Sequence, residues 1–424
     1  MRDTTLIRLA KRARHSTLLA IAWVWRRLMF RTTFIAVTGS VGKSTCREVT
    51  AAVLGSKYPT ISTIGNANFF GGVTRTVRRV RPWHKYAVIE VGIVEPGQMA
   101  RFARALRPDI VILVSIAKTH TMNFRTLETT LREKTALIEG MKPGGVAILN
   151  DDNPYIAGYQ PPSSIRTVYY GSTPRSQFRA TDASSRWPER LSFTLHGPGG
   201  EARRVHTRML GEHWLGSLIP AFAVAAERGL SLAQASEAMG KQEPIARRLS
   251  PVELPNGATI LRDEINGSVD TMAAALRVFA DASAPRKMLV FTDVSDSSKK
   301  PRTRLRDYGR EAARVADSAI FLGENCEHGA NAAVAAGMRP DQVWSFYNIR
   351  DCAQHLKNEL RAGDLVLLRG RRVDHLDRVY YSLVQDVTCW KNRCGKAIQC
   401  HVCPELNAQR PVAVGDGALM QLRR

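Results

Sequence analysis

The fold of this chain is decided by the stretch Phe34-Ile-Ala-Val-Thr-Gly-Ser-Val-Gly-Lys-Ser-Thr45. It predicts a short strand that runs into a glycine turn and then into a helix beginning near Lys43. In such a turn, backbone N–H groups surround an anion, a lysine reaches the outer phosphates and a hydroxyl group contacts Mg²⁺. We therefore expect a nucleotide-phosphate site whose members are Gly39, Ser40, Gly42, Lys43, Ser44 and Thr45.

The phosphate motif is shorter than the usual Walker pattern, because Val37 stands where that pattern has its first glycine. A short Gly-Lys-Ser/Thr sequence also occurs by chance, so an ordinary turn is the alternative interpretation. The strand before the turn, and the apolar positions Val49, Val53 and Leu54 of the helix after it, favour the nucleotide site.

Composition indicates a globular protein of about two to three domains in its 424 residues. Sixty-one Lys and Arg against 38 Asp and Glu give a net charge of +23, which favours anionic partners such as nucleotides, acidic substrates or membrane surfaces. Arginine-rich usage in a GC-rich genome would explain the same excess. We find no nucleic-acid-binding module and no cleavable signal peptide, so we predict a cytoplasmic protein without a nucleic-acid partner.

The domain prediction begins with a basic and apolar extension, residues 1–30. Its apolar run, Thr17 to Trp25, is far shorter than the about 20 residues that a membrane-spanning helix needs. Flanking arginines suit a helix at a membrane interface, which would place the protein peripherally at the inner membrane face. A helix packed on the catalytic domain is the alternative.

The predicted fold class is α/β. Residues 31–243 form an ATP-binding domain whose mostly parallel sheet includes apolar strands near 86–91, 110–116 and 146–149. A small β excursion is expected within 156–210. Residues 244–385 alternate strands and helices as in a Rossmann-like α/β domain, and 386–424 form a short Cys-rich tail.

Two side chains at strand ends predict a metal site. Glu90 ends a buried strand, at the edge where open α/β sheets bind ligands, and a buried carboxylate needs a partner such as a metal. His120 follows the next strand and would complete an Mg²⁺ site. The alternatives are a solvated acid and a hydrogen-bonded polar histidine.

The tail contains a second candidate metal site, formed by Cys389, Cys394, Cys400 and Cys403. Its second pair is tightly spaced and its first is irregular, so a structural Zn²⁺ site, free or redox-active thiols and an iron–sulfur centre all remain open. A protein partner could bind through this tail. The isolated Cys46, Cys326 and Cys352 are expected to be core residues.

Taken together, these segments resemble the Mur ligase family, and most closely its MurF type, over residues 31 to 385. The matching pieces occur in order: Val37-Thr-Gly-Ser-Val-Gly-Lys-Ser-Thr45, Gly65-Asn-Ala-Asn68, Ala87-Val-Ile-Glu-Val-Gly92, Pro108-Asp-Ile-Val-Ile-Leu-Val-Ser115 leading to His120, Glu133-Lys-Thr-Ala-Leu-Ile138, Gly144-Gly-Val-Ala-Ile-Leu-Asn150, Gly211-Glu-His213, Arg248, Asp263-Glu-Ile-Asn266 and Leu368-Arg-Gly-Arg371.

The resemblance implies an ATP- and Mg²⁺-dependent ligase that joins a carboxylate to an amine through an acyl phosphate. It implies catalytic roles for Lys43, Glu90, His120 and Lys134. Ser44, Glu90 and His120 would be Mg²⁺ ligands, joined by Lys134 as a carbamate. Without the resemblance, Lys134 would be read as a solvated helix lysine. Positions that would contact the nucleotide or its metal are Asn66, Asn68, Arg248, Asp263 and Asn266.

Departures from the family pattern affect the substrate prediction. MurF-type enzymes have a substrate domain before the phosphate loop, and this sequence does not show one there. We therefore expect an acid other than the full UDP-linked peptide, such as a smaller acid, a peptide or a poly-γ-glutamate chain. A MurF-type ligase working with a partner and a non-catalytic nucleotide-binding regulator are the alternatives. Ser217 replaces an asparagine, Thr292 a glycine and Arg369 a lysine, the last of which we expect to suit a carboxylate-bearing amino substrate.

Overall fold

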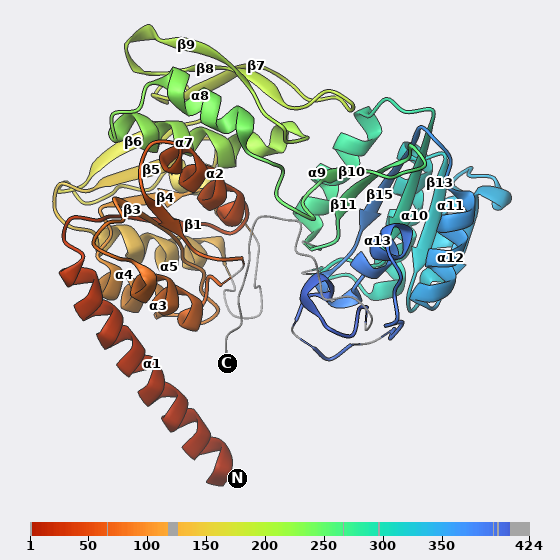
Figure 1. Cartoon of the computed structure of the whole chain (residues 1–424), viewed down its shortest axis with the longest axis horizontal. Helices are drawn as coiled ribbons and strands as arrows, with labels where there is room; N and C mark the ends of the chain where they lie inside the picture. The colour runs from red at the N-terminus through yellow and green to blue at the C-terminus, as the bar shows by residue number, and fades with distance from the viewer. Residues whose placement is uncertain are drawn as a thin grey trace. The chain divides into compact units, whose positions relative to one another are not determined.

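The computed structural model describes residues 2–65, 67–117, 126–265, 267–295, 297–392, 394–396 and 398–407, with the backbone alone for 2–12 and 270. It divides into two compact units (Figure 1). The first unit comprises residues 1–185 and 190–243, and the second comprises 186–189 and 244–424.

The first unit is built on a six-stranded sheet with the order β2-β3-β1-β4-β5-β6, in which each neighbouring pair is parallel. Its strands are β1 (Thr33–Thr38), β2 (Thr60–Ser62), β3 (Tyr86–Glu90), β4 (Ile110–Leu113), β5 (Val146–Asn150) and β6 (Arg166–Tyr170). Parallel strands of this kind are buried on both faces, which explains their continuous apolar sequences. The predicted α/β class with a parallel sheet is confirmed.

Helices cover both faces of this sheet (Figure 1). The core on one face includes residues of α2, α7 and α8, and the core on the other includes residues of α1, α3, α4 and α5. The helices of the unit are α1 (Arg2–Leu28), α2 (Lys43–Gly55), α3 (Phe70–Arg79), α4 (Gln98–Leu106), α5 (Leu127–Glu139), α6 (Pro154–Ala157), α7 (Leu215–Glu227) and α8 (Leu232–Lys241), with 3₁₀ turns η1 (Pro198–Gly200) and η2 (Glu212–Trp214).

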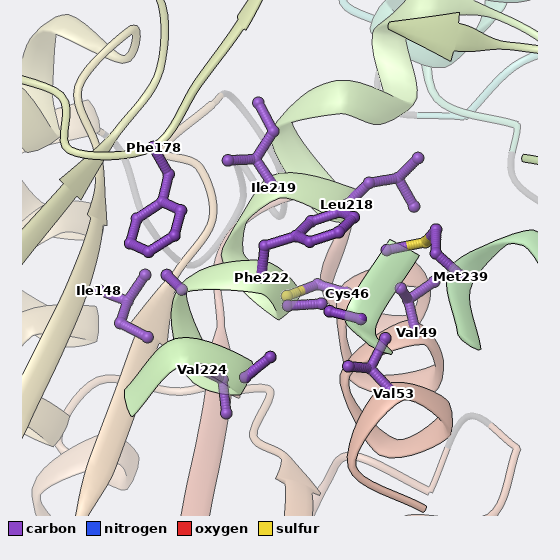
Figure 2. Packing of buried hydrophobic residues seen from close by; sticks show 14 of the residues in the cluster. Cys46, Val49, Val53, Ile148, Phe178, Leu218, Ile219, Phe222, Val224 and Met239 are labelled. Carbon is purple, nitrogen blue, oxygen red and sulfur yellow. The ribbon is translucent and has the colours of Figure 1, made fainter. Parts of the chain in front are cut away.

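Packing between α2 and α7 fixes the position of the phosphate loop. Figure 2 shows Cys46, Val49 and Val53 of α2 beside Leu218 and Phe222 of α7. All five side chains are fully buried, so they hold α2 firmly against the neighbouring helix. Because Lys43 is the first residue of α2, this packing also sets where the helix N-terminus lies.

The predicted β excursion is present as a separate antiparallel sheet of β7 (Arg179–Ser184), β8 (Ser192–His196) and β9 (Ala202–His206). Buried and partly exposed residues alternate along β8, as expected for a strand with one face on the core.

The second half of α1 packs on the first unit. Met29, just after the helix, is buried, and so is the guanidinium group of Arg26. Arg26 Nε donates to the Leu106 carbonyl at 2.8 Å, and its Nη2 donates to Asp109 Oδ2 at 2.9 Å. The interpretation of this segment as a helix packed on the catalytic domain is therefore confirmed for its last turns.

The second unit has a six-stranded sheet with the order β10-β11-β15-β12-β13-β14, parallel except for the antiparallel β10–β11 pair. Its strands are β10 (Ser250–Glu253), β11 (Thr259–Asp263), β12 (Arg286–Phe291), β13 (Ser318–Leu322), β14 (Val343–Phe346) and β15 (Asp364–Arg369). Its helices are α9 (Val269–Asp281), α10 (Pro301–Val315), α11 (Cys326–Ala335), α12 (Ile349–Glu359) and α13 (Asp377–Val384), with 3₁₀ turns η3 (Pro340–Gln342), η4 (Arg372–Asp374) and η5 (Cys400–Val402). This is the predicted Rossmann-like α/β arrangement.

The three isolated cysteines are buried, as predicted: Cys46 in the first unit, and Cys326 and Cys352 in the second. Across the described residues, no helix combines the length and the apolar character that crossing a membrane requires.

Candidate active site

The loop between β1 and α2 requires glycine at two positions. Gly42 has φ 82°, and a Cβ atom there would lie 2.5 Å from Ser217 Oγ. A Cβ atom on Gly39 would lie 3.0 Å from the Ser115 backbone nitrogen. Ser40 N–H donates to the Ser115 carbonyl at 2.8 Å, so the segment after β4 braces the loop. The loop therefore has the close backbone packing expected of a phosphate cradle.

Two lysine side chains converge on this loop. Lys43 Nζ donates to the carbonyl oxygens of Gly39 and Ser40, each at 2.8 Å. Lys134 Nζ, from α5, donates to the same Gly39 carbonyl at 2.8 Å. Lys134 is only 5% exposed, and burial together with the positive charge of Lys43 holds its pKa well below the usual lysine range. The uncharged, nucleophilic amine therefore forms more readily at Lys134 than at a solvated lysine.

Glu90 lies at the end of β3, beside the first turn of α2, and its side chain is fully buried. Ser44 Oγ donates to Glu90 Oε1 at 3.1 Å, and Asn68 Nδ2 donates to the same oxygen at 2.6 Å. Thr63 Oγ1 accepts the backbone N–H of Glu90 at 3.0 Å. Strand β3 and helix α2 thus bring Ser44, Asn68 and Glu90 together, as the sequence motifs suggested.

Arg47 is a member of this cluster that the sequence did not reveal. Its Nε atom lies 3.5 Å from Glu90 Oε2, and the arginine is only 2% exposed. Its Nη atoms donate to the carbonyl oxygens of Thr63 and Gly65. We expected a metal to balance the charge of Glu90, and the structure adds this arginine as a protein partner. The sequence signal that could have identified Arg47 was its position one helical turn after Lys43, in a helix where most neighbouring residues are apolar or small and buried.

Three buried oxygen atoms of this cluster have no hydrogen-bond partner within the described part of the chain: Thr45 Oγ1, Asn68 Oδ1 and Glu90 Oε2. Buried polar atoms are normally paired, so atoms left over around a phosphate loop indicate a place for a ligand. Hydroxyl, amide and carboxylate oxygens are the donors that Mg²⁺ accepts. The residues present therefore fit a magnesium–phosphate group.

Three predicted site residues lie outside the described part of the chain: Asn66, His120 and Asn266. Their predicted roles stay predictions.

In the second unit, Asp263 is bound to Arg369. The two side chains form an ion pair, and Arg369 Nη2 donates to Thr271 Oγ1 at 2.7 Å. Burial raises the pKa of Asp263 to about 7, whereas the charges of Arg369 and Arg248 act in the opposite direction. The backbone N–H of Leu249, the residue after Arg248, donates to Asp263 Oδ1 at 3.3 Å, and the predicted nucleotide contacts of Arg248 and Asp263 stay predictions.

A cavity of about 880 Å³ opens beyond the carboxyl ends of β12, β13 and β15. Asp293, Arg304 and Arg371 bring charged groups to its wall, and Arg304 and Arg371 both pair with Asp293. Cys394 contributes to the wall from the tail. This edge of a parallel sheet is where α/β folds generally bind ligands.

The tail cysteines are distributed differently from the predicted four-cysteine site. Cys400 lies with His375 and Asp377 in a buried group whose ligand atoms are all within 4.8 Å of one another. It is the sole group of three or more such ligands that the described residues form, so Cys389, Cys394 and Cys403 are outside it. Burial and the nearby Asp377 raise the pKa of the Cys400 thiol.

Two family models match the chain. The model for the Mur ligase middle domain matches residues 37–225, and the model for the Mur ligase glutamate ligase domain matches residues 247–372. The chain belongs to the Mur ligase family. The first match contains the phosphate loop, Glu90 and Lys134, and the second contains Asp263 and Arg369.

Relatives of this Mur ligase carry the MurF function. The UDP-N-acetylmuramoyl-tripeptide–D-alanyl-D-alanine ligase of Escherichia coli K12 is 28% identical over 87% of this chain and 80% of its own length. The enzyme of the same name from Bacillus subtilis is 26% identical over 84% and 76%. These similarities support the predicted MurF-type resemblance.

Solved structures share the fold. MurF from Acinetobacter baumannii aligns with a TM-score of 0.80 at 23% identity, covering 87% of this chain and 80% of that one. MurF from Thermotoga maritima, solved in complex with ADP, aligns with a TM-score of 0.74 at 18% identity, covering 87% and 83%. As a Mur ligase, the chain is an ATP-dependent enzyme of the carboxylate–amine ligase class, as the sequence predicted.

The three departures of this Mur ligase have local structural explanations. Ser217 lies against the phosphate loop at Gly42. Thr292 Oγ1 donates to Asp374 Oδ2 at 2.7 Å. The guanidinium of Arg369 is fully buried and occupied by Asp263, so the expectation that it presents a fork to a carboxylate substrate is wrong.

Proposed function

We propose that this chain forms an amide bond through an acyl phosphate. A carboxylate oxygen of the acid substrate attacks the γ-phosphorus of ATP, and the bond from phosphorus to the bridging oxygen of ADP breaks. The amine of the second substrate then attacks the acyl carbon, loses a proton and expels inorganic phosphate. Each catalytic cycle consumes one ATP and yields one amide, one ADP and one phosphate.

The phosphate loop and its two lysines would stabilise the transferring phosphoryl group. The backbone N–H groups from Gly42 to Thr45 would bind the phosphates at the N-terminus of α2, whereas those of Ser40 and Val41 donate to Ser115. Lys43 would leave its carbonyl acceptors at Gly39 and Ser40 and pair with the outer phosphates. This role requires a charged amine, and Lys43 is half-buried whereas Lys134 is buried.

Ser44 and Glu90, together with His120, would hold Mg²⁺, which neutralises charge on the phosphoryl oxygens when bound. Asn68 would orient the Glu90 carboxylate through its hydrogen bond at 2.6 Å, and its own buried amide oxygen has no hydrogen-bond partner among the described residues. Arg47 would offset the negative charge of Glu90 before ATP arrives.

Lys134 would act as a carbamate. A lowered pKa leaves its nitrogen lone pair free to attack the carbon of CO₂, with release of one proton. The product is an anionic oxygen ligand in place of an amine, located beside the phosphate loop. Arg248 and Asp263, with Asn266, would contact the nucleotide from the second unit.

Two observations support this proposal most strongly: among the described residues, buried oxygens of Thr45, Asn68 and Glu90 have no hydrogen-bond partner, and two lysines donate to the phosphate loop. A nucleotide-binding regulator would need the loop, but it would have no need of a buried acidic centre with free ligand atoms.

An oxygen-transfer experiment tests the acyl phosphate directly. The acid substrate is labelled with ¹⁸O in its carboxylate and incubated with ATP, Mg²⁺ and the amine. We expect one ¹⁸O atom in the released phosphate and ADP as the nucleotide product. Formation of AMP and pyrophosphate, or unlabelled phosphate released in step with amide, would refute the mechanism.

The same assay, run on variants, tests the residues. Lys43→Ala and Glu90→Gln are expected to reduce phosphate release by at least about a hundredfold, since each removes charge stabilisation from the transition state. Lys57→Ala is the matched control, because Lys57 is exposed beyond the far end of the same helix. Phosphate release that survives both substitutions would contradict these residue roles, whereas a wild-type chain that releases no phosphate with any substrate pair would favour the non-catalytic alternative.

The substrates are identified by separate arms of this assay. One arm supplies UDP-N-acetylmuramoyl-tripeptide with D-alanyl-D-alanine, the pair in the relatives' names. Other arms supply short acids, free peptides or poly-γ-glutamate with pools of amino acids. The arm that gives an ATP-dependent product identifies the acid substrate. Repeating the UDP-N-acetylmuramoyl-tripeptide arm with a partner protein added tests whether the MurF reaction needs that partner.

We also propose that α1 contacts a membrane surface peripherally. Ile21, Val24 and Leu28 form an apolar stripe on its solvent-facing side, with exposed fractions of 43%, 48% and 57%. Arg27 stacks on Trp23 beside this stripe, as suits the interface of an anionic bilayer. Val24→Glu should abolish sedimentation with anionic vesicles, whereas Trp83→Ser, which changes an exposed tryptophan elsewhere in the unit, should not. Equal sedimentation of both variants would exclude this role for α1.

A further inference from the structure

The described part of the tail, residues 386–407 without 393 and 397, folds back onto the second unit through specific contacts. Ile349 N–H donates to Asn392 Oδ1 at 3.1 Å, and Arg378 donates to the Lys391 carbonyl. A side-chain hydrogen bond also joins Arg247 to Gln399. These contacts place the tail next to the turn that follows β15, where η4 leads into α13.

His375, Asp377 and Cys400 meet at this junction. His375 Nδ1 lies 3.3 Å from Cys400 Sγ, and the ligand atoms of all three residues lie within 4.8 Å of one another. The three side chains are 6%, 5% and 8% exposed. His375 comes from the turn before α13, Asp377 is the first residue of that helix, and Cys400 comes from the tail, so the group joins two separate segments of the sequence.

A cavity of about 440 Å³ borders the group. His375 and Asp377 line it together with Cys394 and Lys396 of the tail. The cavity leaves room on one side of the three ligands, and Cys394 brings a second sulfur atom, and so a fourth candidate ligand, to its wall. A three-ligand centre with one side turned to a cavity has the form of a metal site that keeps a coordination position open.

The donor set narrows the choice of metal. One imidazole, one carboxylate and one thiolate are ligands that Zn²⁺ accepts in tetrahedral sites, whereas Mg²⁺ and Ca²⁺ require oxygen ligands. An ionised Asp377 and a Cys400 thiolate would together carry two negative charges. Arg247 Nη1, 3.8 Å from Asp377 Oδ2, offsets one of them, and a divalent cation would offset the remainder.

We propose that His375, Asp377 and Cys400 bind one Zn²⁺ ion whose fourth position faces the cavity lined by Cys394. The ion joins the tail to the turn between β15 and α13. This turn carries Arg371, which lines the neighbouring cavity of about 880 Å³. Zinc binding therefore fixes one wall of that cavity, and the site is independent of the phosphate loop of the first unit.

Metal analysis of variants separates this site from a four-cysteine site. The full chain is produced with added Zn²⁺, purified without chelators and measured by mass spectrometry of the metal. We expect about one zinc per chain in the wild type. His375→Gln, Asp377→Asn and Cys400→Ser should each reduce the content several-fold, whereas Cys389→Ser and Cys403→Ser should retain it. Cys326→Ser serves as the control for a buried thiol elsewhere in the unit.

Cobalt provides a readout that does not depend on variant folding. Zinc-free wild-type protein titrated with Co²⁺ should show the sulfur-to-cobalt charge-transfer band of a single thiolate. Zn²⁺ should abolish the band by displacement, and Cys389→Ser should leave it unchanged. Zinc loss in Cys389→Ser and Cys403→Ser with retention in His375→Gln would overturn the proposal in favour of four cysteines. Wild-type protein that holds neither Zn²⁺ nor Co²⁺ would overturn it altogether.

Discussion

The ion pair between Arg47 and Glu90 gives the sharpest stability prediction. Its atoms are 3.5 Å apart, and the two side chains are 2% and 0% exposed. Replacing Arg47 by methionine keeps the aliphatic volume but leaves an uncompensated carboxylate in the interior, which costs about 3–5 kcal/mol. Arg47 also donates to two backbone carbonyl groups, so the upper part of this range is expected.

A double-mutant cycle isolates the charge. Glu90→Gln alone leaves Arg47 paired, among the described residues, only with Glu48, at 2.7 Å, whereas Arg47→Met with Glu90→Gln removes both charges of the buried pair and should recover about half of the loss or more. Hydrogen exchange of amides in β1 and β3 reports the free energy of opening for the first unit by itself. If Arg47→Met costs less than about 1 kcal/mol, or if the two single losses simply add, the carboxylate is not held by this arginine.

Three further predictions concern the same unit. In CO₂-free buffer, the free energy of unfolding of the wild type should rise as the pH approaches about 10.5. The reason is that Lys134 loses its proton at a lower pH in the folded chain than in the unfolded chain. Urea titrations at several pH values should show a flatter dependence for Lys134→Met. Gly42→Ala should lower the free energy of unfolding by about 2–5 kcal/mol, because alanine is strained in the left-handed backbone conformation and its Cβ would clash with Ser217 Oγ. Adding Ser217→Ala should relieve the clash but not the backbone strain, so only part of the loss should be recovered in the same titrations. Arg26→Met should expose α1 to limited proteolysis, since Asp109 and the last turns of the helix lose their main connection, and an unchanged cleavage rate would contradict this role.

Local patterns in the sequence were sufficient for the phosphate loop and the sheets. A strand, a glycine turn and a helix leave few alternatives once Gly42 must adopt a positive φ. The end of β3 likewise identified Glu90 before any contact was known, because strand ends in parallel sheets gather at one edge.

Charge partners were harder to predict, because they depend on how helices pack. Lys134 has the local sequence of a solvated helix lysine, and its burial follows only from where α5 meets the phosphate loop. Arg47 was missed for the same reason. The sequence of α2 does not indicate that Glu90, far along the chain, places its Oε2 atom 3.5 Å from Arg47 Nε. The spacing of the tail cysteines likewise gave no sign of His375 and Asp377, which lie just before α13 and at its first residue.

The charges around the phosphate loop suggest why Glu90 needs both an arginine and free oxygen atoms. Ser44 and Asn68 occupy Glu90 Oε1, so this oxygen is oriented without a metal. Glu90 Oε2 has the charge of Arg47 nearby but no hydrogen bond within the described residues, so its charge is offset while a lone pair is left for another ligand. Full pairing would satisfy both oxygens and leave no ligand atom, whereas no pairing would leave a buried charge without compensation. The partial pairing keeps a buried carboxylate both stable and available beside the phosphate loop.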